Sequence, residues 1–288
     1  MGSTPPIPEA QILPPEDLAP PQQTVRKPRP SWVVAPATYL LMAINCGVFL
    51  FMVAHHVSAW GPNSDQLMYF GANHAGAVLI GGQWWRIVTA MFVHVGFIHL
   101  ATNMWCLWNL GLLAEPLVGS AGLVAAYVLT GAAGNLLSTL WNATHPIHDA
   151  VGGVSFPAGA GASGAVFGIA GVLIVLLKSP RLPVPPIELK KLRRSVIYFA
   201  AINLAIGFSI TFGSDMIGSG LKIDNYAHLG GFLCGLLFAL PMVPRFGSPR
   251  PLFQRRLKLT IAMVVCLLVM FGFFIVGYAG YSIVGYTG

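Results

Sequence analysis

The sequence predicts an all-α integral membrane protein, and its composition provides two observations that indicate this class. Hydrophobic residues make up 55% of the 288 residues, and the mean hydropathy is +0.70. Only 25 residues are charged, 16 Lys or Arg and 9 Asp or Glu, whereas a soluble chain of this length would carry about 70. This combination excludes an ordinary soluble domain and a disordered chain.

A third observation is the number of long apolar segments. Each predicted segment is close to the roughly 20 residues that a helix needs to cross a bilayer. The segments are 34–54, 95–113, 120–141, 161–177, 195–212, 226–243 and 259–279. The last contains no charged residue, and the fourth is the shortest. About 30 polar, proline-rich residues precede the first segment, which excludes a cleavable signal peptide there.

The positive charges indicate how these segments are oriented. The N-terminal tail and the loops after the fourth and sixth segments together hold 14 of the 16 Lys and Arg residues, and only Arg86 and Lys222 lie on the other side. Positive charge is concentrated on the cytoplasmic side of membrane proteins, so we expect the N-terminus inside and the C-terminus outside. The same distribution excludes nucleic-acid binding, because the cations flank helices instead of forming a patch on one soluble face.

Polar side chains within the apolar segments are the candidate functional residues, because burying them in lipid is costly. They are His99 and Asn103 in the second segment, Ser163 in the fourth and His228 in the sixth. Helical rise places all four about 18–24 Å from the cytoplasmic ends of their segments. In a hydrocarbon core about 30 Å thick they therefore share one layer below the outer surface.

A serine and a histidine at one depth are the minimal parts of a nucleophile and its general base. Small residues spaced four apart allow helix backbones to touch, and both segments contain them. His99 and Asn103 lie on one helix face and can donate hydrogen bonds to an oxyanion, together with the Ser163 N–H. Each residue alone also fits a packing or helix–helix hydrogen-bonding role. The small residues in question are Gly164 with Gly168 and Gly231 with Gly235.

Four groups of residues form a specific pattern when their order is considered together. They are Trp85-Arg86, His94 with His99-x-x-x-Asn103, Gly161-Ala162-Ser163-Gly164, and Ala227-His228-x-x-Gly231-x-x-x-Gly235. Over residues 35–243 this pattern resembles the rhomboid family of intramembrane serine proteases. The resemblance implies a six-helix bundle, here followed by one C-terminal transmembrane helix, and a Ser–His dyad without a third carboxylate.

The resemblance also implies a role for each matching residue. Ser163 is the expected nucleophile and His228 the expected base, while the Ser163 N–H, His99 and Asn103 are the expected oxyanion hole. Phe167 falls where family members carry a Tyr or Phe ring that packs against the catalytic histidine. The remaining supporting residues match structural, membrane-orienting or close-packing positions, namely His94, Trp85, Arg86, Glu115, Gly161, Gly164, Gly231 and Gly235.

These observations divide the chain into four expected regions. They are a disordered cytoplasmic tail at 1–30, the six-helix catalytic core at 31–243, a basic cytoplasmic linker at 244–258 and the seventh transmembrane helix at 259–281. We expect a serine endopeptidase. Its short tail and short loops favour a bacterial inner membrane, although the charges fit a eukaryotic secretory membrane equally well. The expected partners are the lipid bilayer and single-span transmembrane substrates cleaved near the outer leaflet.

Other functions are less consistent with the residues. A non-catalytic rhomboid-like protein that binds membrane helices or controls their quality would be expected to lack the serine or the histidine. A transporter would be expected to show inverted repeats and broken helices at the midplane. No cofactor or metal is expected, because the sequence contains no HExxH motif.

Overall fold

The computed structural model describes residues 31–148, 153–179, 182, 184–217, 224–245 and 249–287, and it confirms the predicted all-α membrane fold. The tail predicted at 1–30 lies outside the described residues. The elements are α1 (Ser31–Val34), α2 (Pro36–Ala54), α3 (Ser64–Tyr69), α4 (Ala75–Leu79), α5 (Arg86–Thr89), α6 (Phe97–Thr144), β1 (Ile147–His148), β2 (Val154–Ser155), α7 (Ser163–Leu176), α8 (Pro186–Ile217), α9 (Asn225–Ala239), η2 (Leu240–Arg245) and α10 (Arg250–Thr287).

Four stretches in the described part of the chain are long and apolar enough to cross a membrane. They are Pro36–Ala54, Phe97–Thr144, Asn225–Val243 and Arg250–Gly280, and the shorter apolar helix Ser163–Leu176 accompanies them. The second stretch contains two of the predicted segments, because α6 is interrupted at Gly119, where φ is 75° and ψ is 164°. Only glycine adopts such a conformation easily, so Gly119 marks the turn between the two halves of α6.

The acidic residue Glu115 joins this turn to the start of α2. One carboxylate oxygen accepts the Ala37 N–H at 2.9 Å and the Ser120 hydroxyl at 2.6 Å. The other accepts both the N–H and the hydroxyl of Thr38 at 2.8 Å. The first N–H groups of a helix lack partners within the helix and attract negative charge. Glu115 therefore satisfies the N-terminus of α2, and it lies near the Gly119 break, at the opposite end of the first half of α6 from His99.

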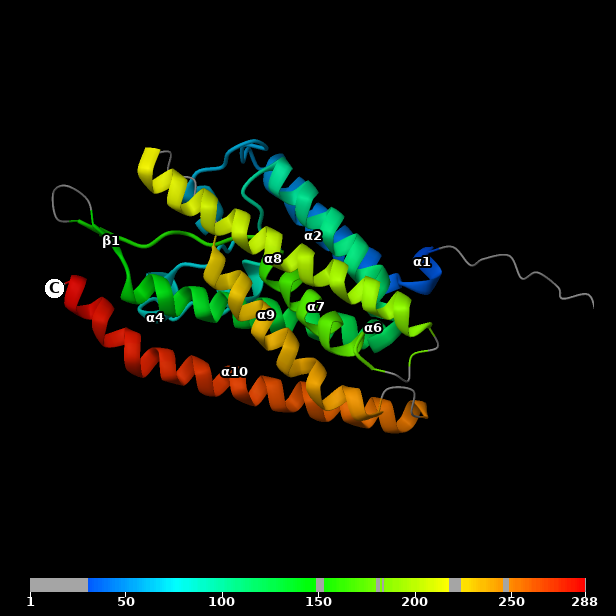
Figure 1. Ribbon diagram of the computed structural model, residues 1–288. Coiled ribbons are helices and arrows are strands. Elements are labelled where there is room, and N and C mark those ends of the chain that lie inside the picture. The colour runs from blue at the N-terminus through cyan, green and yellow to red at the C-terminus, as the bar shows by residue number, and fades with distance from the viewer. Residues whose placement is uncertain are drawn as a thin grey trace, which may run out of the picture. The chain divides into compact units, whose positions relative to one another are not determined.

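Helix α7 lies among its neighbours, between α6, α8 and α9 (Figure 1). Most of its side chains are buried, and its small residues Gly164, Ala165, Gly168, Ala170 and Gly171 allow close approach from several sides. Its C-terminal end meets α8, where the Arg193 side chain donates to the Ile174 carbonyl at 3.0 Å. A cation at the C-terminus of a helix complements the negative end of its dipole.

Two helices are longer than the predicted segments. The cationic stretch from Lys190 to Arg194, expected in a loop, forms the first turns of α8. Helix α10 begins at Arg250, so much of the linker predicted at 244–258 is helical. Both extensions contain Lys and Arg residues, and their backbone hydrogen bonds are made within the helix.

Helix α10 runs beside α6 and α4 (Figure 1). Near its C-terminal end, Ile275 and Ala279 are fully buried against Ala75 and Val78 of the first loop. Helix α10 therefore packs on α6 and on the loop that follows α2.

Candidate active site

The predicted nucleophile and base lie within hydrogen-bonding distance. His228 Nε2 is 2.8 Å from Ser163 Oγ, although the two residues are 65 positions apart. His228 is buried, with 7% of its surface exposed, while Ser163 keeps partial exposure. The distance is within the range required for an imidazole to take a proton from a hydroxyl.

Glycine contacts between α7 and α9 fix this pair in register. A Cβ on Gly231 would overlap the Gly164 carbonyl, and a Cβ on Gly235 would overlap the Gly168 carbonyl. The small residues spaced four apart on each helix are thus paired one to one across the interface. Side chains at these positions would push the helices apart and separate Ser163 from His228.

The ring of Phe167 orients the histidine. It lies parallel to the His228 imidazole, with an interplanar angle of 11° and ring centroids 4.4 Å apart. Phe167 follows Ser163 by one helical turn, so the same helix positions the hydroxyl and the stacking ring. Among the described residues, no hydrogen-bond partner is present at His228 Nδ1, and stacking fixes the ring plane instead.

Ser163 is the first residue of α7, so the N-terminus of this helix faces the pair. The Val166 N–H donates to the Ala162 carbonyl at 3.0 Å, which is the first hydrogen bond of the helical pattern. The N–H groups before Val166 in α7 have no such acceptor within the helix. A helix N-terminus is a favourable place for negative charge. The Ser163 N–H therefore lies where an oxyanion would be stabilised.

His99 adjoins the loop that leads into α7, and Asn103 follows it by one helical turn on α6. A Cβ on Gly161 would come within 2.5 Å of His99 Cε1, and Gly161 has a φ of +129°, so both space and conformation require glycine. The Asn103 amide donates to the His99 carbonyl at 2.8 Å. An amide nitrogen has two N–H groups, so this bond leaves one for another acceptor. Among the described atoms, His99 Nδ1 is buried without a partner.

His94 supports the loop before Ser163 through a hydrogen bond to its backbone. Its Nδ1 lies 3.2 Å from the Phe92 carbonyl and its Nε2 accepts the Ala162 N–H at 3.4 Å, an arrangement that requires the proton on Nδ1. Burial, with a smaller effect from His99, lowers the pKa of His94 to about 3. The neutral imidazole is thus the form that supports Ala162, the residue before Ser163.

Trp85 and Arg86 organise the loop between α2 and α6. The Arg86 guanidinium donates to the carbonyls of Met68 and Ala72 at 2.6 and 2.9 Å and to Gln83 Oε1 at 2.6 Å. It also lies 4.5 Å from the centre of the Trp85 ring. Arg86 is buried and makes these bonds within its own loop, so both residues shape the loop.

One residue pair near the site was missed by sequence reasoning. Asp224 caps α9 by accepting the Ala227 N–H at 2.9 Å, and it also accepts the hydroxyl of Ser138 on α6. Burial raises the pKa of Asp224, and these bonds oppose the shift. An acidic residue directly before an apolar helix is a capping signal that could have identified Asp224, whereas Ser138 carries no such signal.

Residues 81–245 match the model of a known protein family. The rhomboid domain matches residues 81–245, which is more than half of the chain and contains all of the residues described above around Ser163 and His228. The chain belongs to the rhomboid family. This rhomboid contains no group of three or more His, Cys, Asp or Glu side chains suited to a metal ion among its described residues.

Three curated relatives illustrate the relationship. Rhomboid protease GluP of Bacillus subtilis (strain 168) is 29% identical over 79% of this chain and 38% of its own length. RHOMBOID-like protein 1 of Arabidopsis thaliana is 31% identical over 70% of this chain and 46% of its own. Rhomboid protease AarA of Providencia stuartii is 27% identical over 72% of both chains. The chain thus spans less than half the length of the first two, and the named proteases support a protease at the level of the family.

Proposed function

We propose that this rhomboid is an intramembrane serine endopeptidase whose catalytic dyad is Ser163 and His228. The observation that carries the proposal is the 2.8 Å contact between Ser163 Oγ and His228 Nε2. Burying a serine and a histidine between two apolar helices is costly unless the pair has a function. A nucleophile beside its general base explains why both residues occupy this position.

The proposed reaction is acyl transfer through a covalent intermediate. Ser163 Oγ attacks the carbonyl carbon of the scissile peptide while His228 Nε2 takes the hydroxyl proton. The protonated His228 then gives this proton to the leaving amine, and an acyl-enzyme remains on Ser163. A water molecule, deprotonated by His228, then attacks the acyl carbon. As the bond from this carbon to Ser163 Oγ breaks, His228 returns the proton to Oγ and the second product leaves as a carboxylic acid. Stacking on Phe167 keeps the imidazole in plane through both steps.

The negative charge of each tetrahedral intermediate is assigned to an oxyanion hole. The Ser163 N–H at the N-terminus of α7 is its first donor, and the His99 ring and the second amide N–H of Asn103 are the others. The Gly161 turn supports this role, because it brings the chain against His99 without a side chain between them. A charge forming at this place is close to the positive end of the α7 dipole.

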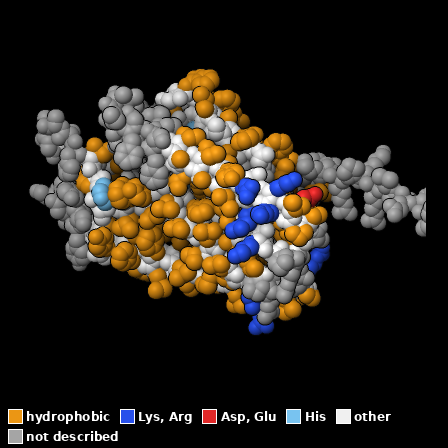
Figure 2. Space-filling view, viewed as in Figure 1, with side chains coloured by type: hydrophobic (Ala, Val, Ile, Leu, Met, Phe, Trp, Pro, Cys, Tyr) orange, Lys and Arg blue, Asp and Glu red, His pale blue; other side chains and the backbone are white. Residues whose placement is uncertain are grey.

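We also propose the orientation and the substrate class. Figure 2 shows Lys and Arg side chains gathered at one end of the visible face, beside a broad hydrophobic surface. By the positive-inside rule this end is cytoplasmic, so the N-terminus lies inside and the C-terminus outside. The short loops favour a bacterial inner membrane as the location. The 31–243 core is the catalytic region, and its substrates are single-span transmembrane proteins cleaved near the outer leaflet.

Labelling by a fluorophosphonate probe tests the dyad in the full chain, reconstituted in lipid nanodiscs. Wild type is expected to label, while Ser163→Ala and His228→Ala are expected to lose labelling with an unchanged melting temperature. Ser155→Ala is the matched control, because Ser155 is an exposed serine in β2, and it should label as wild type does. Equal labelling of wild type and Ser163→Ala would refute the assignment.

The orientation has a separate test in a cysteine-free background. A cysteine at the exposed residue Asp65, in the first loop, should react with an impermeant thiol reagent added to intact cells. A cysteine at the exposed residue Lys190, in α8, should react only after the cells are opened. The reverse pattern would contradict the proposed orientation.

A further inference from the structure

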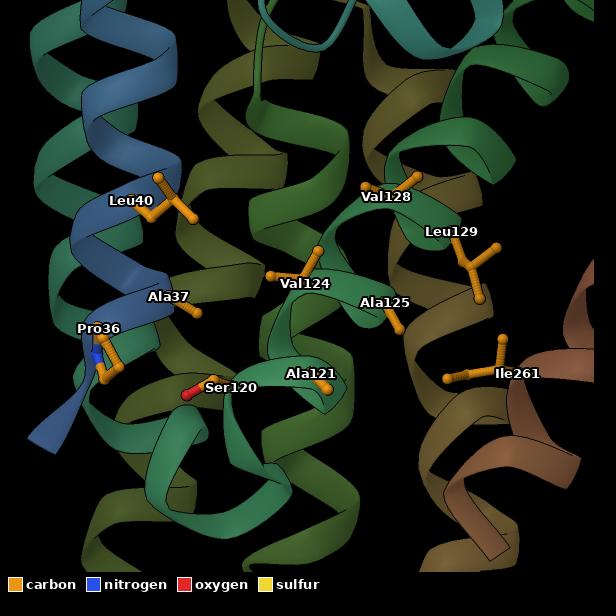
Figure 3. A pocket seen from close by; sticks show the side chains of 10 residues that line it. All are labelled: Pro36, Ala37, Leu40, Ser120, Ala121, Val124, Ala125, Val128, Leu129 and Ile261. Atoms are coloured by element: carbon orange, nitrogen blue, oxygen red, sulfur yellow. The ribbon is translucent and has the colours of Figure 1, made fainter. Parts of the chain in front are cut away.

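An open apolar groove lies between α2, α6 and α10, and neither Ser163 nor His228 lines it. Its volume is about 640 Å³, and α2, the second half of α6 and α10 form its walls (Figure 3). Leu40 from α2, Val124 and Val128 from α6, and Ile261 from α10 point into it. Aliphatic side chains from three helices thus line one open groove.

A second, more polar cavity adjoins one end of this groove. Its volume is about 620 Å³, and both cavities share Ser120 and Ala121 in the first turn after the Gly119 break. Arg250 and Gln254 from the start of α10 also line it. The continuous site is therefore apolar along its length and carries a cation and an amide at its mouth.

This combination is complementary to a lipid with an anionic headgroup. The wall from Ala121 to Leu129 extends about 12 Å along α6, close to the thickness of one hydrocarbon leaflet, about 15 Å. An acyl chain matches that length and the aliphatic lining. At the mouth, a guanidinium and an amide are donors suited to phosphate oxygens. Free phosphate would satisfy the mouth but leave the groove without a partner.

We propose that this site binds one anionic phospholipid, with an acyl chain in the groove and the phosphate against Arg250 and Gln254. The basic first turns of α8 and α10 lie at the same end of the bundle (Figure 1), so the surrounding surface attracts anionic headgroups as well. Because the groove has walls from both the six-helix core and α10, the bound lipid connects the seventh helix to the core.

Thermal unfolding of the purified full chain in neutral detergent tests the proposal. Added dioleoyl phosphatidylglycerol should raise the melting temperature, while dioleoyl phosphatidylcholine and inorganic phosphate should raise it much less. Arg250→Gln should weaken the apparent affinity for phosphatidylglycerol by about fivefold, since one cation near a lipid surface contributes about 1 kcal/mol. Arg255→Gln is the matched control, because Arg255 is exposed on the same helix but lines neither cavity.

A second variant tests the acyl-chain part of the site. Val124→Phe places a ring in the groove and should reduce stabilisation by phosphatidylglycerol without changing Arg250. Its melting temperature without added lipid shows whether the variant is folded. Equal stabilisation of wild type, Arg250→Gln and Val124→Phe by phosphatidylglycerol would overturn the proposal. Stabilisation by inorganic phosphate alone would likewise overturn it, because the mouth would then be an anion site without a lipid.

Discussion

The contact between Gly231 and the Gly164 carbonyl permits a quantitative test of how α7 and α9 position the dyad. A Cβ at Gly231 would overlap the Gly164 oxygen, and ordinary van der Waals contact begins at 3.4 Å. In Gly231→Ala the two helices must therefore separate by more than 1 Å to reach ordinary contact. A misplacement of about 1 Å already costs on the order of 10²-fold in rate. His228 lies less than one turn from Gly231, so the separation acts directly on its distance from Ser163.

A graded series makes this prediction specific. A Cβ at Gly164 would lie 3.2 Å from the Ala227 carbonyl, so Gly164→Ala requires a much smaller adjustment. Gly47 in α2 has nothing within 4 Å of an added Cβ, and Gly47→Ala should retain activity and gain about 0.5–1 kcal/mol of stability. The expected order of activity loss is Gly231→Ala, then Gly164→Ala, then Gly47→Ala.

The assay follows two readouts in the same proteoliposomes. One is the rate of fluorophosphonate labelling, and the other is the initial rate of cleavage of a single-span reporter. The melting temperature of each variant in detergent separates altered geometry from unfolding. A Gly231→Ala variant that labels at the wild-type rate would refute the packing argument, because the structure leaves no room for the added methyl group.

Three further predictions concern the surroundings of the dyad. Phe167→Leu keeps an apolar side chain but removes the stacking on His228, worth about 0.5–1.5 kcal/mol, so the cleavage rate should fall about two- to tenfold with little change in KM; an unchanged rate would exclude this role. Glu115→Gln leaves donors of α2 unsatisfied and should lower the free energy of unfolding by about 1–3 kcal/mol, measured by denaturant unfolding, while dyad labelling persists. Burial lowers the pKa of His94 to about 3 in the folded chain, whereas the pKa in the unfolded chain is about 6.5. As the pH falls, the unfolded chain is therefore protonated before the folded chain, and stability should fall below about pH 6.5. Melting curves at pH 7.5 and 5.0 should show a smaller loss in His94→Gln, and equal losses would contradict this account.

The sequence could predict the members of the site because polar residues are rare in apolar segments. Ser163 and His228 stand out for this reason, and helical rise brings them to one depth. The spacing of Gly231 and Gly235 predicts a close helix contact, and the structure pairs them with Gly164 and Gly168. Local patterns were sufficient here, because each helix carries its own periodicity.

Features that depend on distant partners could not be predicted in the same way. The hydroxyl of Ser138 reaches Asp224 across 86 positions, and the Glu115 carboxylate reaches Thr38 across 77. Nothing in the local sequence of Ser138 distinguishes it from a packing serine. The helical start of α8 was also missed, because a cationic stretch at the membrane edge fits a loop or a helix until Arg193 meets the end of α7.

The length of α7 has a consequence for where a substrate would be cut. Its 14 residues extend about 21 Å, while the hydrocarbon core is about 30 Å thick. If the C-terminal end of α7 lies at one membrane surface, Ser163 lies about 9 Å inside the other, a depth equal to about six residues of a substrate helix. The number of turns in α7 would then set the depth at which a substrate is cleaved, so that adding a turn moves the scissile bond toward the surface.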